Sequence, residues 1–279
     1  MKAYVSVDME GIAAVFTPTQ VIPKGDEYQI ARKWMTAEVK TVAETLHRLG
    51  AERIVIADSH AGMINLLVDE LPEYVELLSG FPRETCMVNS IGQGFDFAIF
   101  VGYHSKKGEK YSIMDHTISS RVIQRILIND EEVSEFWLNA AVAGYYNVPV
   151  IFTTGDDKLV SHARQLIPEI EAVITKFSVG RRAAISKHPK MVASEIRTKL
   201  EVAIDKWKNG EIKPFKRDGP LNVVVEVTDS TVGDVAEFIP AIHRSSGNVL
   251  TFRSEDIITA YKLIEVITII GLGVMSLSE

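Results

Sequence analysis

Four side chains that can bind a metal ion follow closely on three apolar, β-like stretches of the sequence. The stretches are 3–7, 53–57 and 97–101, and the side chains that follow them are Asp8, Glu10, His60 and His104. The carboxyl ends of parallel strands meet at one edge of an open α/β sheet, where ligands bind. Two neighbouring carboxylates repel unless a proton or cation relieves them, and carboxylate and imidazole are common zinc ligands. The pattern therefore predicts a site for one or two zinc-like ions.

Other acidic residues near these stretches have two interpretations each. Asp58 either orients His60 through a hydrogen bond, as carboxylates often do for metal-bound imidazoles, or serves as a turn residue. Asp156 and Asp157 follow the apolar stretch 148–153 and precede a helix signal. N-capping explains at least one of these two aspartates, and a direct catalytic role is the less favoured alternative.

Local pattern gives no catalytic role to two further residues. Glu135 is expected in the first turn of a helix that begins after Ser134, where a carboxylate is stabilised by the helix macrodipole whatever its function. His116 lies between strand signals, in a region that could overhang the site. An isolated histidine is more often a surface or structural residue. On pattern alone, we therefore interpret Glu135 as a capping residue and His116 as structural.

The composition is typical of a soluble globular enzyme. The 279 residues are 46% hydrophobic and 24% charged, which fits one large domain or two small ones. The net charge of −7 is interspersed along the chain, so a nucleic-acid partner is not expected. The single cysteine, Cys86, excludes an intramolecular disulfide, indicates a reducing compartment and is expected to be a buried small hydrophobe.

No targeting or membrane segment is expected. The N-terminus lacks the apolar region and small-residue cleavage site of a signal peptide. The apolar stretch 257–275 contains Lys262 and Glu265 and is interrupted by two glycines, so it predicts a buried helix rather than a membrane span. We expect a cytoplasmic protein without a membrane partner.

Strand and helix signals alternate along most of the chain. The expected strands are 3–7, 53–57, 75–78, 97–101, 122–128 and 148–153, and the expected helices are 26–49, 135–146 and one that begins near 158. In the first of these helices, apolar residues recur at spacings of three and four. The alternation predicts an α/β fold with a mostly parallel sheet and helices on both faces.

The last third of the chain has a different texture. It contains an amphipathic helix over 191–207, strands at 221–227 and 249–252, and a final helix after 254, but few chemically reactive side chains. We therefore divide the chain into a metal-binding catalytic α/β domain, 1–185, and a smaller C-terminal α/β part, 186–279, that contributes to assembly.

Several motifs together resemble the zinc D-aminopeptidases of peptidase family M55. The motifs are the segments 5–12 (VSVDMEGI), 58–60 (DSH), 102–104 (GYH), 114–116 (MDH), 129–135 (NDEEVSE), 138–140 (LNA) and 143–146 (AGYY). They occur in the family's order and spacing, and the likeness is strongest over the first 160 residues or so.

The resemblance implies a site with two Zn²⁺ ions. Asp8 matches the bridging carboxylate, Glu10 and His60 complete one ion, and His104 and Glu135 complete the other. His116 matches the histidine proposed as nucleophile in that family. The resemblance also implies a decamer of two stacked five-fold rings, whose active sites face an inner channel that admits short peptides.

One position departs from the family pattern. The residue before His116 is Asp115, where serine is common in the family. A carboxylate at this position is expected to change the basicity or orientation of His116.

The leading hypothesis is a cytoplasmic di-zinc aminopeptidase that releases N-terminal amino acids, such as D-alanine, from short peptides or amides. A metal-dependent amidase or phosphoesterase is the alternative among enzymes, although no cluster of basic residues near the motifs would hold a phosphate. A non-catalytic metal- or peptide-binding protein is the alternative from another class. Structural zinc sites are usually closed by Cys or His, whereas a carboxylate-rich site leaves positions open for water, which favours catalysis. Spacing does not distinguish D from L substrates.

Overall fold

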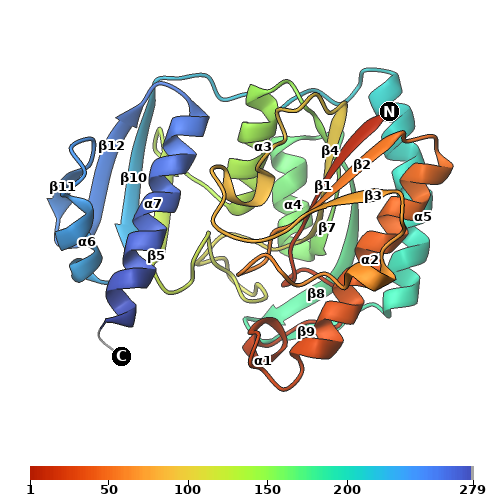
Figure 1. Ribbon diagram of the computed structural model, residues 1–279, viewed down its shortest axis with the longest axis horizontal. Coiled ribbons are helices and arrows are strands. Elements are labelled where there is room, and N and C mark those ends of the chain that lie inside the picture. The colour runs from red at the N-terminus through yellow and green to blue at the C-terminus, as the bar shows by residue number, and fades with distance from the viewer. Residues whose placement is uncertain (278–279) are drawn as a thin grey trace.

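The protein is described by a computed structural model over residues 1–277, in which the chain forms two β-sheets (Figure 1). The larger sheet has seven strands in the order β3-β2-β1-β4-β7-β8-β9, all parallel except β9. Its strands are β1 (Lys2–Val7), β2 (Arg53–Asp58), β3 (Val75–Leu78), β4 (Phe97–Tyr103), β7 (Val150–Asp156), β8 (Glu171–Gly180) and β9 (Ala183–Ser186). The predicted α/β fold with a mostly parallel sheet is confirmed.

Helices cover both faces of this sheet, as predicted (Figure 1). The helices α2 (Tyr28–Arg48) and α5 (Pro189–Lys208) pack together on one face. The helices α3 (Glu135–Tyr145) and α4 (Asp157–Leu166) lie on the other. The central strands β1 and β4 are buried almost throughout, because helices exclude water from both faces.

The smaller sheet is antiparallel, with the order β11-β12-β10-β5-β6. Its strands are β5 (Ile123–Ile128), β6 (Glu131–Glu132), β10 (Leu221–Val227), β11 (His243–Ser246) and β12 (Val249–Ser254). The helices α6 (Ser230–Ala236) and α7 (Ile257–Ser276) pack on it.

The division of the chain into 1–185 and 186–279 stays a prediction. The two sheets partition the chain in another way, since β5 and β6 precede residue 185 but join the smaller sheet. Conversely, α5 follows residue 185 and packs against α2 and β8 of the larger sheet.

Among residues 1–277, α7 is the helix long and apolar enough to cross a membrane by length and composition, with a mean hydropathy of 1.9. In the fold α7 contacts α3, α6, β10 and β12. Eight of its residues are buried, including Tyr261 and Glu265. The contacts of α7 are those of a helix that joins the smaller sheet to the helical layer of the larger one.

Several elements, most of them short, were not expected from the sequence. They are α1 (Pro18–Val21), the two 3₁₀ turns η1 (Val68–Glu70) and η2 (Cys86–Val88), the longer strand β8 with its partner β9, and β6, α6 and β11 in the smaller sheet and its covering layer. Two of them, α1 and η2, lie close to the strand ends described next.

The ends of β1, β2 and β4 lie next to one another because β1 pairs with β2 on one side and β4 on the other. The chain reverses its direction of winding here, which is where open α/β sheets bind ligands. Two glycines allow the loops after β1 and β4 to touch. A Cβ atom on Gly11 would collide with the carbonyl of Tyr103, and one on Gly102, at φ +68°, with the carbonyl of Asp8. The topology therefore delivers the polar residues of these loops to one point.

Candidate metal centre

The structure brings all five predicted metal ligands together in one buried cluster. Asp8, Glu10, His60, His104 and Glu135 each expose 6% or less of their surface. The first four come from the ends of β1, β2 and β4, and Glu135 from the first turn of α3. Ser134 caps α3 by accepting a hydrogen bond from the Trp137 backbone N–H. The helix therefore begins at Glu135, and this cap fixes the position of the Glu135 backbone.

One half of the cluster is centred on His60. Its Nδ1 lies 3.1 Å from Asp8 Oδ1 and 3.0 Å from Glu10 Oε2. Its Nε2 lies 2.8 Å from the carbonyl oxygen of Val21, at the end of α1. A carbonyl accepts only, so Nε2 carries a hydrogen, and in the neutral imidazole Nδ1 presents its lone pair to the two carboxylates.

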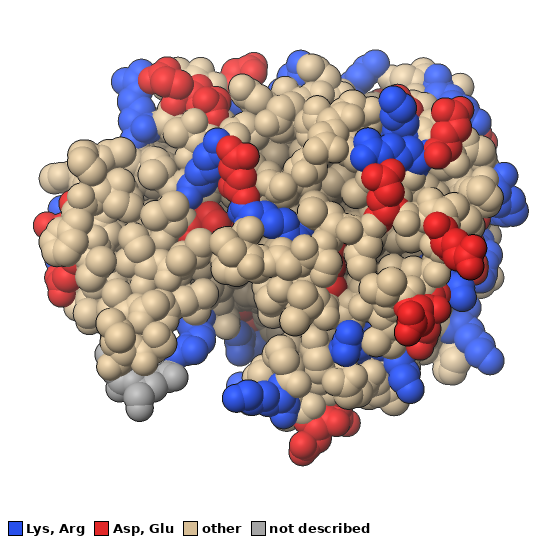
Figure 2. All heavy atoms as spheres, viewed as in Figure 1, with Lys and Arg blue, Asp and Glu red and all other residues tan. Residues whose placement is uncertain are grey.

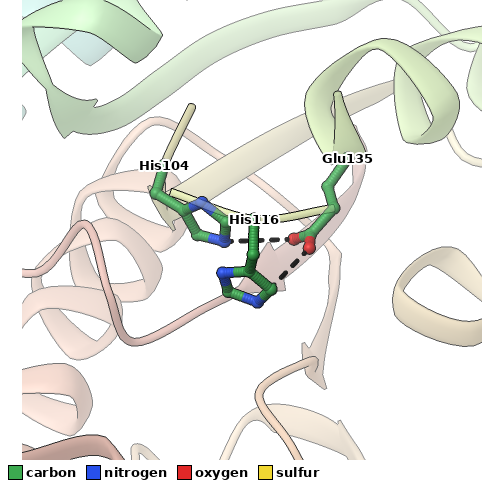
Figure 3. Close-up of side chains that lie close together, drawn as sticks. All are labelled: His104, His116 and Glu135. Atoms are coloured by element: carbon green, nitrogen blue, oxygen red, sulfur yellow. Dashed lines mark ion pairs between the residues drawn. The ribbon is translucent and has the colours of Figure 1, made fainter. Parts of the chain in front are cut away.

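The other half is centred on His104 (Figure 3). Its Nε2 lies 3.4 Å from Asp8 Oδ2 and 3.4 Å from Glu135 Oε2. Its Nδ1 lies 2.8 Å from the carbonyl oxygen of Ser105, which fixes the hydrogen on that nitrogen. Asp8 therefore presents one oxygen to each half of the cluster.

The distances within the cluster fit metal coordination. Two ligand atoms bound tetrahedrally at about 2.1 Å from a zinc ion lie about 3.4 Å apart. In addition, Asp8 Oδ2, Glu10 Oε2 and His104 Nε2 are buried without a hydrogen-bond partner among the described residues. Buried polar atoms are rarely left unpaired, so these three atoms fit the role of metal ligands.

Burial and mutual charge perturb the ionisation of the cluster. Burial, together with the charge of Glu10, raises the pKa of Asp8 to about 8. Burial opposes ionisation of Glu10, yet the charge of His60 holds the pKa of Glu10 well below its usual range. The pKa of His104 is raised well above its usual value because, despite burial, the charges of Glu135 and Asp8 favour its cationic form. A buried group of opposing charges of this kind is typical of a functional site.

His116 also lies in the cluster, although its local pattern indicated a structural residue. Its ring stacks on that of His104 with 4.2 Å between ring centroids, and its Nε2 lies 3.6 Å from Glu135 Oε1. Its Nδ1 is fixed by the carbonyl of Met114 at 2.9 Å. Burial and the nearby charge of His104 lower the pKa of His116. His104, His116 and Glu135 also form a triad of potential ligands within 4.8 Å of one another.

The carboxylate of Asp115 makes its contacts away from the His116 ring. One oxygen accepts a hydrogen bond from the Gly108 backbone N–H at 2.6 Å, and the other from Arg181 Nε at 2.8 Å. The charges that act on the pKa of His116 are those of His104, Glu135 and Glu10. The contacts of Asp115 thus lie within the loop and with the turn that carries Arg181.

Asp58 acts as an organiser of a turn rather than as a partner of the His60 ring. It accepts hydrogen bonds from the Asn65 side chain at 2.7 Å and the Leu66 backbone at 2.8 Å. Asn65 in turn donates to the His60 carbonyl at 2.7 Å. Asp58 therefore orders the loop that carries His60.

Asp156 and Asp157 have structural contacts. Asp156 caps α4 through the Leu159 N–H at 2.7 Å, and Asp157 accepts from the Ser178 N–H at 2.8 Å. The capping interpretation of Asp156 is confirmed.

One buried residue near the site was missed by sequence analysis. Lys176, on β8, is completely buried, and its Nζ donates to the carbonyls of Glu10, at 2.5 Å, and Val15. Lys176 thus anchors the loop that carries Glu10 through two of the loop's backbone carbonyls. The sequence offers no signal for this role, because a lone lysine in a short mixed stretch is usually exposed.

Buried carboxylates and imidazoles at the carboxyl edge of a parallel sheet define an α/β protein with the ligand set of a metallohydrolase. The family model for D-aminopeptidases, peptidase family M55, matches residues 1–266. The D-aminopeptidase of Bacillus subtilis (strain 168) is 30% identical over 269 residues, which are 96% of this chain and 97% of the relative. The chain belongs to peptidase family M55 and is a peptidase.

The fold agrees with that of a solved relative. The zinc-dependent D-aminopeptidase DppA of Bacillus subtilis, a self-compartmentalizing protease, superimposes with a TM-score of 0.92. The match covers 98% of each chain at 29% sequence identity. The smaller antiparallel sheet is therefore included in the shared fold.

Proposed function

We propose that this chain is a zinc-dependent aminopeptidase that releases N-terminal amino acids, D-alanine in particular, from short peptides or amides. The observation that carries the proposal is the placement of Asp8 between two imidazole-centred groups, with one oxygen toward each. The names of the family and of the solved relative support both the metal and the D-configured substrate.

The two halves of the cluster would each hold one Zn²⁺. Asp8, Glu10 and His60 would hold the first, and Asp8, His104 and Glu135 the second. Zinc in a site with open positions lowers the pKa of bound water and polarises a carbonyl, which is the chemistry that peptide hydrolysis requires. The backbone carbonyls of Val21 and Ser105 orient the two imidazoles for this task.

His116 would transfer the proton. Because Nδ1 is fixed on the Met114 carbonyl, Nε2 is the atom free to accept a proton and deliver it to the leaving amine. Nε2 faces Glu135 and lies at the open side of the cluster, since the His116 side chain is 16% exposed whereas that of His104 is 1% exposed.

The assembly and location of the protein are further parts of the proposal. The self-compartmentalizing relative supports a homo-oligomer, and a decamer of two stacked five-fold rings would restrict the sites to short peptides. The single cysteine supports a cytoplasmic location, where thiols stay reduced.

The test uses purified protein, a chelator and paired substrates. We expect D-alanyl-D-alanine and D-alanine p-nitroanilide to be cleaved, and the activity to disappear after chelation and return with Zn²⁺. N-acetyl-D-alanyl-D-alanine, whose amino terminus is blocked, should resist cleavage, and the L-configured pair measures stereopreference. Unchanged turnover after verified removal of the metal, or equal cleavage of the blocked peptide, would contradict the proposal.

A further inference from the structure

The loop that carries His116 has a strained backbone. Met114 and Ile118, two residues to either side of His116, both adopt positive φ angles, 43° and 62°, in the left-handed region that side chains with a Cβ avoid. Tyr111 has a φ of 53° in the same loop. Such conformations persist only where surrounding contacts enforce them, and they concentrate at functional sites.

Each strained residue next to His116 is held by a hydrogen bond from outside the loop. The Ile118 N–H donates to Glu135 Oε1 at 2.6 Å, so Glu135 holds this side of the loop with one oxygen while the other faces His104. The Met114 N–H donates to the Arg181 carbonyl at 2.9 Å. Arg181 belongs to the turn between β8 and β9, which is remote from the loop in sequence.

The side chain of Arg181 strengthens the second attachment. Its Nε donates to Asp115 Oδ1 at 2.8 Å and its Nη2 approaches the Asp115 carbonyl at 3.3 Å. The other Asp115 oxygen accepts from the Gly108 N–H at 2.6 Å, which closes the loop on itself. The Asp115 side chain is 10% exposed and that of Arg181 49%, so the ion pair is shielded on one side only.

We propose that Asp115 and Arg181 are positioning residues, which fasten the His116 loop to the β8–β9 turn and so fix the placement of the His116 ring on His104. The inference rests on the proposed function of His116. The carboxylate of Asp115 accepts one hydrogen bond from Gly108 within the loop and one from Arg181 in the β8–β9 turn, so it links the loop both to itself and to that turn. Arg181 alone supplies a backbone acceptor and two side-chain donors to consecutive residues, 114 and 115.

The test compares Arg181→Ala, Arg181→Lys and Asp115→Asn with Arg182→Ala, a change at the exposed neighbour in the same turn. We expect Arg181→Ala and Asp115→Asn to keep their bound zinc and their KM for D-alanine p-nitroanilide. Their kcat should fall by about tenfold to a hundredfold, because His116 is misplaced. Arg181→Lys keeps the positive charge but loses the second hydrogen bond, the one to the Asp115 carbonyl, so its kcat should lie between those of the two variants and the wild type. Arg182→Ala should behave as wild type.

Hydrogen exchange of the peptide 108–118 gives a second readout that needs no turnover. The exchange should become faster in Arg181→Ala and Asp115→Asn while the midpoint of thermal unfolding changes little. The double variant that combines Arg181→Ala with Asp115→Asn should have a kcat no lower than that of the worse single variant, because the two residues act as one unit.

Wild-type kcat and unchanged exchange in Arg181→Ala would overturn the positioning role. Failure of the wild type to cleave the substrate would instead contradict the proposed function, and the exchange experiment would still decide whether the ion pair orders the loop.

Discussion

Each of the three imidazoles at the site is fixed by a backbone carbonyl rather than by a carboxylate. His60, His104 and His116 use one ring nitrogen on the carbonyls of Val21, Ser105 and Met114, respectively. Fixing one nitrogen leaves the other with its lone pair toward the carboxylates, so the local loop conformation determines the ligand atom. The loops after the strands are therefore part of the metal site, in addition to the ligands they carry.

The role of His116 is testable by a single substitution. His116→Ala should retain the zinc of the wild type, because His104 approaches both Asp8 and Glu135 without the help of His116. Its kcat should fall by about a hundredfold to ten-thousandfold, the usual contribution of a positioned acid–base group. The measurements are metal content by atomic absorption and steady-state turnover of D-alanine p-nitroanilide.

The control for this experiment is His47→Ala, a change of an exposed histidine on α2. Loss of zinc from His116→Ala would assign His116 to the metal ligands, as the triad of His104, His116 and Glu135 allows. Near-full turnover with intact metal would remove His116 from the mechanism.

At the scale of elements, a chain of buried hydrogen bonds connects the smaller sheet's helix to the metal-binding loops. Tyr261 of α7 donates to the Asn139 side chain at 2.9 Å, and Asn139 donates to the Tyr103 hydroxyl at 3.0 Å. Tyr103 lies 2.7 Å from the hydroxyl of Ser6, which lies 2.8 Å from that of Ser59. Tyr103 precedes His104 and Ser59 precedes His60, so the network joins α7 and α3 to β4, β1 and the residue that follows β2, next to the ligands.

The acidic residue Glu265 makes the packing of α7 sensitive to pH. Burial raises the pKa of Glu265 to about 7 from its usual value of 4.5, with a hydrogen bond from the thiol of Cys86 partly opposing the rise. Between these values the folded protein holds a proton that the unfolded chain releases, so stability falls as the pH rises and the loss is complete above about 7. Glu265→Gln should abolish this loss.

Chemical unfolding of both proteins with saturating zinc, from pH 5 to 8, measures the effect. We expect the two free energies of unfolding to diverge as the pH rises, with the variant gaining roughly 2–3 kcal/mol on the wild type between pH 5 and pH 8. Parallel curves across this range would show that Glu265 ionises without cost in the folded protein.

The elements that hold the first ligands could be predicted because their signals are local. An apolar stretch such as 97–101 ends in Gly102 and His104, and the topology of a parallel sheet then places its end beside those of its neighbours. The strand β8 was missed because Glu171, Thr175 and Lys176 interrupt its apolar pattern. The interruption has a structural cause, since Lys176 is buried to hold the loop carrying Glu10.

The positions of Glu135 and His116 could not be deduced from local pattern. Glu135 begins a helix, and every feature of its local sequence fits capping. Its approach to His104 depends on how α3 packs on β4, which is tertiary information. The same holds for His116, whose loop is shaped by Arg181 from a turn far along the chain. Only the resemblance to a family placed these two residues at the site.

At the scale of the whole molecule, charge is spread rather than gathered. Figure 2 shows Lys and Arg side chains lying beside Asp and Glu over the upper and right-hand parts of the face it presents, with a notch at the lower edge. A dispersed charge pattern gives no electrostatic reason for binding a polyanion. The apolar surface is a better guide to partners, and one apolar group lies on the hairpin of β8 and β9.

This hairpin exposes Phe177, Val179 and Ile185 to solvent, by 46%, 56% and 69%. Phe177 and Ile185 are cross-strand partners, and β9 is the last strand in the sheet order. Exposed apolar side chains at a sheet edge favour association between protein chains, and a subunit contact in the proposed homo-oligomer would bury them. Phe177→Asp should therefore lower the mass in solution, which for the proposed decamer of 31.0 kDa chains would be about 310 kDa.

Light scattering after size exclusion measures this mass, with Val202→Asp, a change at a 43% exposed position on α5, as the matched control. Because Arg181 follows β8 and holds the His116 loop, dissociation at the hairpin should also lower kcat more than it lowers bound zinc. A Phe177→Asp protein that keeps the wild-type mass would place the interface elsewhere. A dissociated protein with full kcat would show that the turn holds the His116 loop without help from a neighbouring subunit.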